Sequence, residues 1–236
     1  MTTLHEPGRI RAITLDLDDT LWPIAPVIER AERALQDWLR PQAPATAGFL
    51  SDAARRLALR QRILAERPQA AHDLRALRRE LLRRALQQHG EDVALVDAAY
   101  EVFIGERMRV QLYADAEPAL AWLAARYPLV AVSNGNADIH RIGLGRYFRA
   151  ALSAQDFGVG KPDARIFHAA AQAAGVAAQE VLHVGDDPAL DIQGALGAGM
   201  HAVWVNRAGA PWPHDGYRPH ASAGNLAELC RLLQPA

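Results

Sequence analysis

The sequence has 236 residues, half of them hydrophobic, and a formal net charge of −1. A chain of this length can bury a substantial core, either as one large domain or as a core with a sizeable insertion. Its near-neutral charge provides no electrostatic attraction to nucleic acid or to a membrane surface, so neither is expected as a partner.

The cysteine content and the first residues bear on the cellular compartment. Cys230 is the single cysteine, which excludes an internal disulfide and favours a reducing compartment. Residues 1–8 lack the basic segment and apolar core of a secretory signal, and no apolar run approaches the length of a membrane span. We therefore expect a cytoplasmic protein.

An apolar, β-branched run that begins near Ile10 predicts a buried strand, and it ends in Asp16, Asp18, Asp19 and Thr20. Strands of open α/β sheets present ligand-binding groups at their carboxyl ends. Carboxylates that converge there repel one another, by about 4 kcal/mol at 4 Å with an effective dielectric constant of about 20. A cation, a lysine or protonation must relieve this repulsion. The alternative interpretation is a solvated acidic turn that caps the next helix.

A block of amphipathic helices without a convincing strand follows. Apolar residues at helical spacing predict helices over about 27–39, 51–66, 74–86 and 93–103. Because this block interrupts the chain directly after the first strand, we expect an inserted cap domain. The predicted organisation is a core formed by residues 1–21 and 111–236 and a helical cap domain formed by residues 22–110.

From Asp115 onward, predicted helices and strands alternate. The strands are expected near 129–132, 151–152, 181–184 and 202–205, and the helices over 116–126, 163–174, 188–198 and from Ser222. A loop over 206–221 separates the last strand from the last helix. Alternation with continuous apolar strands is typical of a doubly wound parallel sheet, so we predict an α/β, Rossmann-like core.

Three glycines, Gly194, Gly197 and Gly199, are spaced like a dinucleotide-binding fingerprint. They lie at the wrong end of a predicted helix for that role. We interpret them instead as a site of close packing and a helix stop.

Three further segments near predicted strand ends carry polar groups: Ser133 with Asn134, a loop with Lys161, and Asp186 with Asp187. Each is weak alone, since serine and aspartate after a strand often cap the next helix. Together they supply carboxylates for a hard cation, a hydroxyl and backbone N–H groups for phosphate oxygens, and an ammonium group to neutralise charge.

Lys161 is also the single lysine among 26 basic residues, the others being arginine. A lysine that persists in such a composition is a candidate for a site that requires a compact ammonium group rather than a planar guanidinium group. The alternative is that one lysine remained by chance.

These residues form a recognisable order: Asp16-x-Asp18-x-Thr20, Ser133-Asn134, Lys161-Pro162, and Gly185-Asp186-Asp187 with Asp191 four residues later. The order resembles the haloacid dehalogenase superfamily, whose members are mostly phosphatases. The resemblance spans the whole chain and places a helical cap after the first motif.

The resemblance implies a two-step phosphoryl transfer. Asp16 would be the nucleophile that forms an aspartyl phosphate, and Asp18 would act as general acid and then as general base. Magnesium would be bound by the Asp16 carboxylate, the Asp18 backbone carbonyl and Asp186, with Asp187 as a direct or water-mediated ligand.

The same resemblance assigns the groups around the phosphate. Ser133 and the Asn134 N–H would bind phosphoryl oxygens, Thr20 would fix the first loop at the phosphate site, and Lys161 would offset the charge of the nucleophile and the phosphate. Asp191 would orient Lys161 or a water molecule on the metal.

The expected partner is a small phosphorylated metabolite, and the chain is expected to be a monomer or a homodimer. The motif stretches are similar to a bacterial branch that hydrolyses flavin mononucleotide and the phosphorylated ribitylaminouracil of riboflavin synthesis. Trp22, where the chain enters the cap, is either a packing residue at the hinge or a substrate contact.

Three other functions are compatible with the same fold. A haloacid dehalogenase would need neither an acid at Asp18 nor a metal at Asp186, and both acids are present. A sugar-phosphate mutase would keep the phosphoenzyme and return the phosphate to its substrate. A non-catalytic binding module would be expected to have lost one of these groups.

Overall fold

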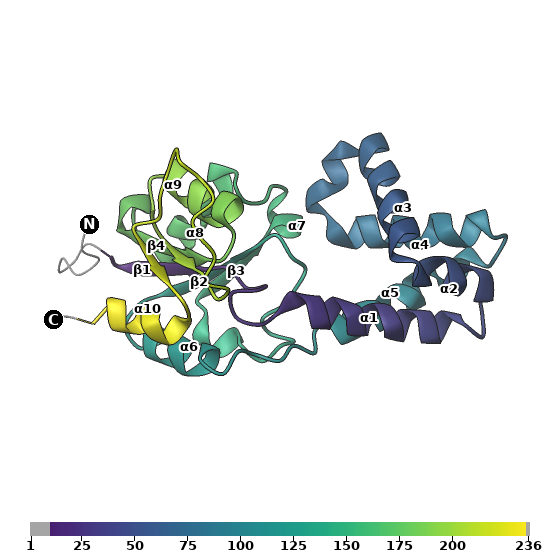
Figure 1. Cartoon of the computed structure of the whole chain (residues 1–236), viewed down its shortest axis with the longest axis horizontal. Helices are drawn as coiled ribbons and strands as arrows, with labels where there is room; N and C mark the ends of the chain where they lie inside the picture. The colour runs from purple at the N-terminus through teal and green to yellow at the C-terminus, as the bar shows by residue number, and fades with distance from the viewer. Residues whose placement is uncertain (1–9, 235–236) are drawn as a thin grey trace. The chain divides into compact units, whose positions relative to one another are not determined.

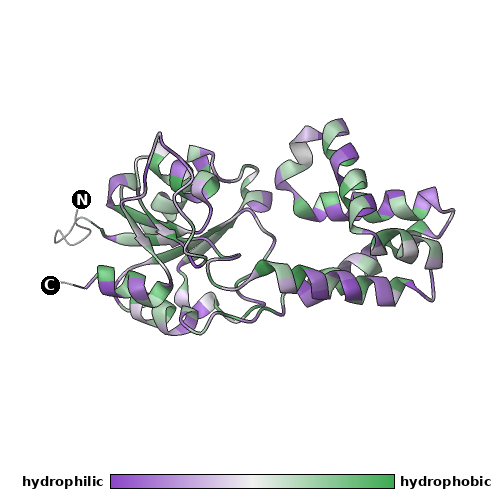
Figure 2. Cartoon of the chain, in the orientation of Figure 1, coloured by the Kyte–Doolittle hydropathy of each residue, from purple (hydrophilic) through white to green (hydrophobic). Residues whose placement is uncertain are grey.

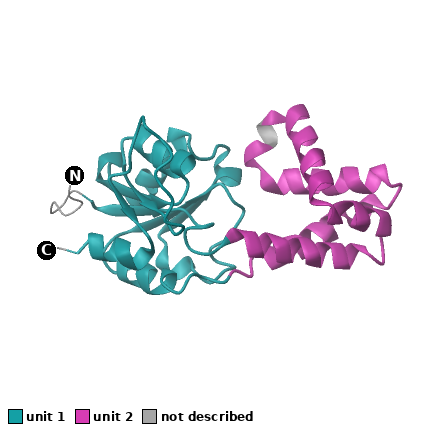
Figure 3. Cartoon of the chain, viewed as in Figure 1, with its two compact units in different colours: residues 1–23, 111–236 teal, residues 24–110 magenta. Residues whose placement is uncertain are grey.

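The computed structural model describes residues 10–234, and the chain divides into two compact units (Figure 3). One unit, here called the core unit, comprises Met1–Pro23 and Gln111–Ala236. The other, called the helical unit, comprises Ile24–Val110. Each unit has its own buried apolar residues and is described separately.

Among the described residues, six parallel strands form the sheet of the core unit in the order β3-β2-β1-β4-β5-β6 (Figure 1). The strands are β1 (Ala12–Leu15), β2 (Leu129–Ser133), β3 (Ala150–Ser153), β4 (Val181–Gly185), β5 (His201–Val205) and β6 (Ala221–Ala223). Central strands β1, β2, β4 and β5 are buried along their whole length, which explains their continuous apolar sequences. The predicted doubly wound α/β core is confirmed.

Helices cover both faces of this sheet, with α8 and α9 on one face and α6 and α10 on the other (Figure 1). The helices of the core unit are α6 (Ala116–Ala124), α7 (Ala154–Phe157), α8 (Ala164–Ala174), α9 (Gly194–Gly197) and α10 (Leu226–Leu232). Phe167 and Ile166 of α8 pack on Ala12, Val130 and other strand residues of the same face. The strands that carry polar groups at their ends are therefore held by a closely packed apolar layer.

The helical unit contains helices only, as far as its residues are described: α1 (Ile24–Leu39), α2 (Pro44–Ser51), α3 (Ala53–Glu66), α4 (Leu74–Gln88) and α5 (Val96–Arg107), with short 3₁₀ turns at Pro68–His72 and Val93–Leu95. Polar and apolar residues alternate along α1 in the pattern of an amphipathic helix (Figure 2). Buried Glu32 of α1 pairs with Arg78 of α4 at 2.8 Å, and the Arg78 guanidinium lies 3.9 Å from the centre of the Phe103 ring in α5.

Three local predictions differ from the structure. Helix α2 (Pro44–Ser51) was not predicted; it begins at a proline, which the first turn of a helix tolerates because it needs no N–H there. The predicted helix 188–198 is a π-helical turn, η5 (Pro188–Gln193), followed by α9. Strand β6 falls at the end of the expected loop, and Asn225 caps the last helix. No described helix has the length and apolar character required to cross a lipid bilayer.

The three glycines of the rejected dinucleotide motif have different roles. A Cβ on Gly194 would lie 2.6 Å from the Phe167 ring and 2.9 Å from the Pro162 Cα. A Cβ on Gly197 would meet nothing within 4 Å, and Gly199 has a φ of +78°. Close packing is therefore confirmed at Gly194, and Gly199 adopts the left-handed conformation that follows a helix end.

This contrast gives a stability prediction. Gly194→Ala should lower the free energy of unfolding by about 1–3 kcal/mol, because the added methyl group must displace an aromatic ring and the backbone. Gly197→Ala, the matched control in the same helix, should leave stability unchanged or raise it by up to about 1 kcal/mol. Urea denaturation followed by circular dichroism measures both, and equal effects would contradict the packing argument.

Candidate active site

A pocket of about 170 Å³ lies at the carboxyl ends of β1, β2 and β4. Apart from Thr20, every residue singled out from the sequence as a site residue lines it: Asp16, Asp18, Ser133, Asn134, Lys161, Asp186, Asp187 and Asp191, together with Gly135 and Leu190. These residues are up to 175 positions apart in the sequence, since Asp16 and Asp191 are both present. Parallel strands bring them to one edge because their carboxyl ends coincide.

The first acid, Asp16, directly follows β1 and is nearly buried. Its backbone N–H donates to the Val184 carbonyl of the neighbouring strand β4 at 2.9 Å, so sheet pairing continues to the acid itself. Thr20 does not line the pocket: it is fully buried, and its hydroxyl donates to Asp186 Oδ1 at 3.0 Å. The hydroxyl joins the first loop to a second acidic strand end, in agreement with the expected role of Thr20 in fixing this loop, and a role of Thr20 at the phosphate stays a prediction.

Lys161 is buried between two carboxylates. Its Nζ donates to Asp16 Oδ1 in a short contact and to Asp191 Oδ1 at 2.6 Å. The loop that carries it is clamped by the Asn134 side chain, whose Nδ2 donates to the Lys161 carbonyl at 2.8 Å and whose Oδ1 accepts from the Lys161 N–H at 2.7 Å. A Cβ on Gly160 would lie 2.5 Å from that Oδ1, so the clamp requires glycine there.

His183 was not singled out from the sequence, yet it supports this ion pair. It is fully buried in β4, opposite Thr14 of β1 in the sheet register. Its Nε2 lies 3.0 Å from Asp191 Oδ1 and its Nδ1 lies 2.8 Å from the Thr14 hydroxyl. Burial lowers the pKa of His183, so the ring is neutral and its Nε2–H faces the carboxylate while Nδ1 accepts from Thr14.

Asp191 approaches the strand end closely because residue 185 is glycine. A Cβ on Gly185 would lie 2.2 Å from the Asp191 Cγ. The second oxygen, Oδ2, accepts from the Asp187 N–H at 3.0 Å. The sequence signal for this contact is a glycine at the end of an apolar strand, six residues before a buried acid.

The charges of this cluster shift its pKa values in opposite directions. Burial disfavours the charged form of Lys161, but Asp16 and Asp191 raise its pKa above the usual value, so it stays an ammonium group. Burial would raise the pKa of Asp191, but Lys161 and His183 hold it well below the usual range. For Asp16, burial raises the pKa and the Lys161 charge opposes the shift.

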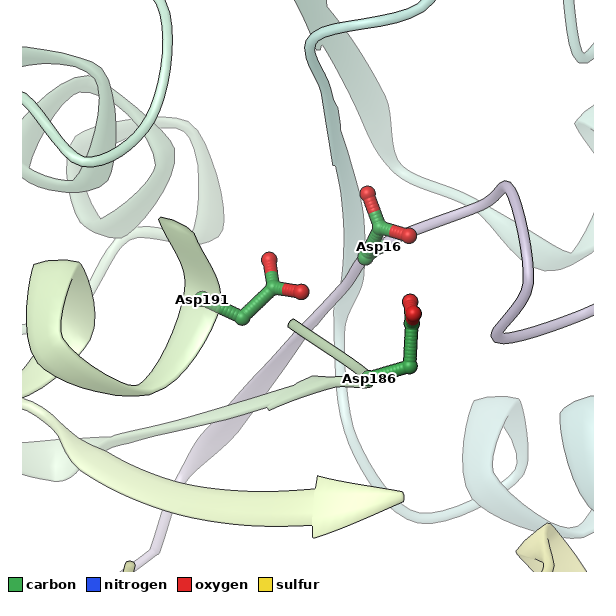
Figure 4. Close-up of side chains that lie close together, drawn as sticks. All are labelled: Asp16, Asp186 and Asp191. Carbon is green, nitrogen blue, oxygen red and sulfur yellow. The ribbon is translucent and has the colours of Figure 1, made fainter. Parts of the chain in front are cut away.

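Asp186 completes an acidic cluster with Asp16 and Asp191, in which carboxylate oxygens of the three residues lie within 4.8 Å of one another (Figure 4). The lysine bonds to the other two carboxylates, whereas Asp186 accepts from the neutral hydroxyl of Thr20. Burial, and then the Asp191 charge, raise the pKa of Asp186 to about 7. An oxygen cluster with this unrelieved charge suits a hard divalent cation.

Two other site residues are held by local hydrogen bonds. The Ser133 hydroxyl accepts from the Gly135 N–H at 2.9 Å, at the end of β2. Asp187 Oδ1 accepts from the N–H groups of Ala189 and Leu190, both at 2.8 Å, so it caps the following helical turn. The structure therefore shows the capping role of Asp187 and leaves its metal-binding role a prediction.

Trp22 is fully buried, and its indole Nε1 donates to Asp18 Oδ1 at 2.9 Å. A direct substrate contact, one of the two alternatives from the sequence, does not fit a side chain without exposed surface. The indole instead contacts the acid expected to protonate the leaving group.

Comparison with known proteins agrees with this geometry. The family model for haloacid dehalogenase-like hydrolases matches residues 10–199. The chain belongs to the haloacid dehalogenase-like hydrolase family. The chain is 35% identical over 239 residues to the 5-amino-6-(5-phospho-D-ribitylamino)uracil phosphatase YigB of Escherichia coli K12, covering 96% of this chain and 97% of that protein.

Two further matches differ in the activity that they name. A phosphoserine phosphatase of Thermus thermophilus is 37% identical over 158 residues, which cover 64% of this chain and 63% of that protein. A crystal structure described as a 2-haloacid dehalogenase from Pseudomonas syringae pv. Tomato DC3000 superposes with a TM-score of 0.88 at 43% identity, covering 94% of this chain and 97% of that one. The chain is thus an enzyme of a hydrolase family that includes phosphatases.

The raised pKa of Asp186 gives a pH-dependent prediction. A carboxyl group whose pKa is higher in the folded state than its usual value of 3.8 binds more protons when folded, so its contribution destabilises the fold progressively as the pH rises toward about 7. Asp186→Asn removes this pH-dependent contribution to stability. In EDTA, the melting temperature of the variant relative to wild type should therefore rise between about pH 5 and pH 8. A constant difference across this range would contradict the assignment.

Proposed function

We propose that this chain is a magnesium-dependent phosphatase that hydrolyses a small phosphorylated metabolite through an aspartyl phosphate on Asp16. The observation that carries the proposal is the buried Lys161–Asp16 ion pair beside Asp18 and Asp186 in one pocket. A charged lysine next to an acid favours the ionised form of that acid and offsets the charge of an incoming phosphate, both of which assist nucleophilic catalysis on a phosphate ester.

The proposed chemistry has two displacements. An Asp16 carboxylate oxygen attacks phosphorus, the bond between phosphorus and the ester oxygen breaks, and a proton moves from the Asp18 carboxyl group to the departing oxygen to give the alcohol. Water then attacks the aspartyl phosphate, its proton passes to the Asp18 carboxylate, and the Asp16 carboxylate is restored with release of inorganic phosphate. The Ser133 hydroxyl and the Asn134 N–H bind phosphoryl oxygens.

The residues present fit a magnesium ion. Asp16 and Asp186 supply carboxylate oxygens, the Asp18 backbone supplies a carbonyl, and Asp187 lines the same pocket. When bound, the ion would stabilise negative charge on the phosphoryl oxygens. Because Asp191 forms an ion pair with Lys161, we propose that Asp191 orients the lysine.

The dehalogenase name of the similar crystal structure defines the main alternative function. Halide leaves without a proton, so a dehalogenase has no use for a pocket acid at Asp18 or for the charged cluster at Asp186. Chloride release from 2-chloropropionate without phosphate release from any ester would establish the alternative. A phosphoenzyme that returns its phosphate to a sugar phosphate would identify a mutase, and a chain without any turnover would be a binding module.

For the substrate, we propose the phosphorylated ribitylaminouracil of riboflavin synthesis or flavin mononucleotide. The support is the match to YigB, which covers almost the full length of both chains. We propose further that the helical unit is the cap that selects the substrate. A screen of phosphorylated metabolites ranked by kcat/KM, including both compounds, sugar phosphates, phosphoserine and phosphoglycolate, tests this proposal. A clear preference for phosphoserine or phosphoglycolate would overturn it.

The first functional prediction concerns the nucleophile. Asp16→Asn should abolish hydrolysis of p-nitrophenyl phosphate in magnesium buffer, because an amide forms no acyl phosphate here. The fold should persist, since the amide oxygen still accepts from Lys161 and one of the crowded negative charges is removed. Circular dichroism and the melting temperature provide the control. Near wild-type turnover in the purified variant would exclude Asp16 as the nucleophile.

The second concerns the single lysine. The planar guanidinium of Lys161→Arg must displace the phosphate or pair sideways with a carboxylate, and loss of a well-placed charge-stabilising donor typically costs about a hundred- to a thousandfold in rate. We expect kcat/KM for p-nitrophenyl phosphate to fall at least about tenfold, with the melting temperature changed by only a few degrees. Arg126→Lys, an exposed exchange of the same two residue types, is the matched control. Wild-type kinetics for both variants would remove Lys161 from the mechanism.

A further inference from the structure

We propose that Trp22 is a positioning residue that fixes which oxygen of Asp18 carries the transferable proton. The inference rests on the proposed function, because it assigns a partner to the general acid of that reaction. It arises from one contact, the 2.9 Å hydrogen bond from the indole Nε1 to Asp18 Oδ1.

The turn that makes this contact is tightly specified. The Leu21 N–H donates to the Leu17 carbonyl at 2.8 Å and the Asp19 N–H donates to the Trp22 carbonyl at 2.7 Å, so the backbone returns on itself between the acid and the indole. Asp19 has a φ of 58°, a left-handed conformation that aspartate tolerates better than most residues. The Leu21 carbonyl also accepts from the Tyr113 N–H at 3.0 Å, which ties the turn to a distant segment of the core unit.

Burial makes the indole a rigid donor. Trp22 has no exposed surface, whereas Asp18 is partly exposed and lines the pocket. A buried indole N–H without an acceptor would be costly, so the hydrogen bond to Asp18 is retained whenever the turn is folded. The fixed ring therefore restrains the orientation of the carboxyl group.

The chemistry of the two groups assigns the proton. An indole N–H is a donor only, so the carboxyl oxygen that faces it must offer a lone pair. The carbonyl oxygen of a carboxylic acid is a stronger acceptor than its hydroxyl oxygen, so the indole favours the proton of Asp18 on Oδ2 and its transfer to the ester oxygen from Oδ2. The indole N–H can donate to Oδ1 whether Asp18 is protonated or ionised, so the Asp18 side chain keeps one orientation through both displacements.

The test measures how the effect of a substitution depends on the leaving group. p-Nitrophenyl phosphate releases a stable phenolate that needs little protonation, whereas phenyl phosphate has nearly the same shape and depends more strongly on a general acid. Because kcat/KM reports the steps up to departure of the first product, the ratio of the two values isolates protonation of the leaving group. A purely structural role for Trp22 would reduce both values equally.

For Trp22→Phe we expect kcat/KM to fall about tenfold on phenyl phosphate and less than about threefold on p-nitrophenyl phosphate, a fraction of the 10²–10⁴-fold that general acids contribute. Leu21→Val is the matched control, since it removes apolar volume from the same turn and keeps the indole–carboxylate bond; its ratio should be that of wild type. Incorporation of 3-benzothienylalanine in place of Trp22 retains the ring shape without the N–H and should reproduce the ratio if Trp22→Phe folds poorly.

Asp18→Asn, measured in parallel, separates the positioning role of Trp22 from the general-acid role of Asp18. A large leaving-group dependence in Asp18→Asn, with an unchanged ratio in Trp22→Phe and in the benzothienyl variant, would overturn the role of Trp22 and leave the proposed function intact. Equal losses of Asp18→Asn on both esters would overturn the general-acid assignment itself. A changed ratio in Leu21→Val equal to that of Trp22→Phe would assign the effect to packing of the turn.

Discussion

The buried ammonium group of Lys161 is the interaction on which the rest of the site depends. It donates to Asp16 and Asp191, and all three side chains are almost entirely shielded from solvent. Removing the lysine would leave two buried carboxylates without a compensating charge, and loss of one partner from a buried ion pair typically costs about 3–5 kcal/mol. The fold accordingly secures the lysine from two sides: Asn134 clamps its backbone, and His183 holds Asp191.

One lysine does not balance the acids around it, and this imbalance has a functional consequence. Asp186 is kept beside Asp16 and Asp191 by the Thr20 hydroxyl, and its backbone carbonyl accepts from the Trp204 indole at 2.7 Å. It therefore has little freedom to relax away, and its pKa rises to about 7. In the function proposed here, a cation would relieve the repulsion among these acids, an exchange of stability for function that is common at active sites.

Features of the fold and of the site that depend on local sequence could be predicted, whereas features that depend on strand order or strand pairing could not. Polar residues at strand ends converge because the sheet is parallel, so the motifs around Asp16, Ser133 and Asp186 were sufficient to predict the pocket. The His183–Thr14 contact depends on β1 lying next to β4, an order that a single sequence does not specify. Strand β6 has three residues and no apolar run, so its assignment depends on pairing with β5.

The hydrogen bonds described above for Asp16, Trp22 and Trp204 join residues of the core unit. The phosphoryl chemistry proposed here is thus organised by the sheet of the core unit and its loops. The relatives matched over this chain include phosphatases named for a ribitylaminouracil phosphate and for phosphoserine. In the function proposed here, the reaction class depends on residues that the core unit fixes, and the helical unit selects the substrate.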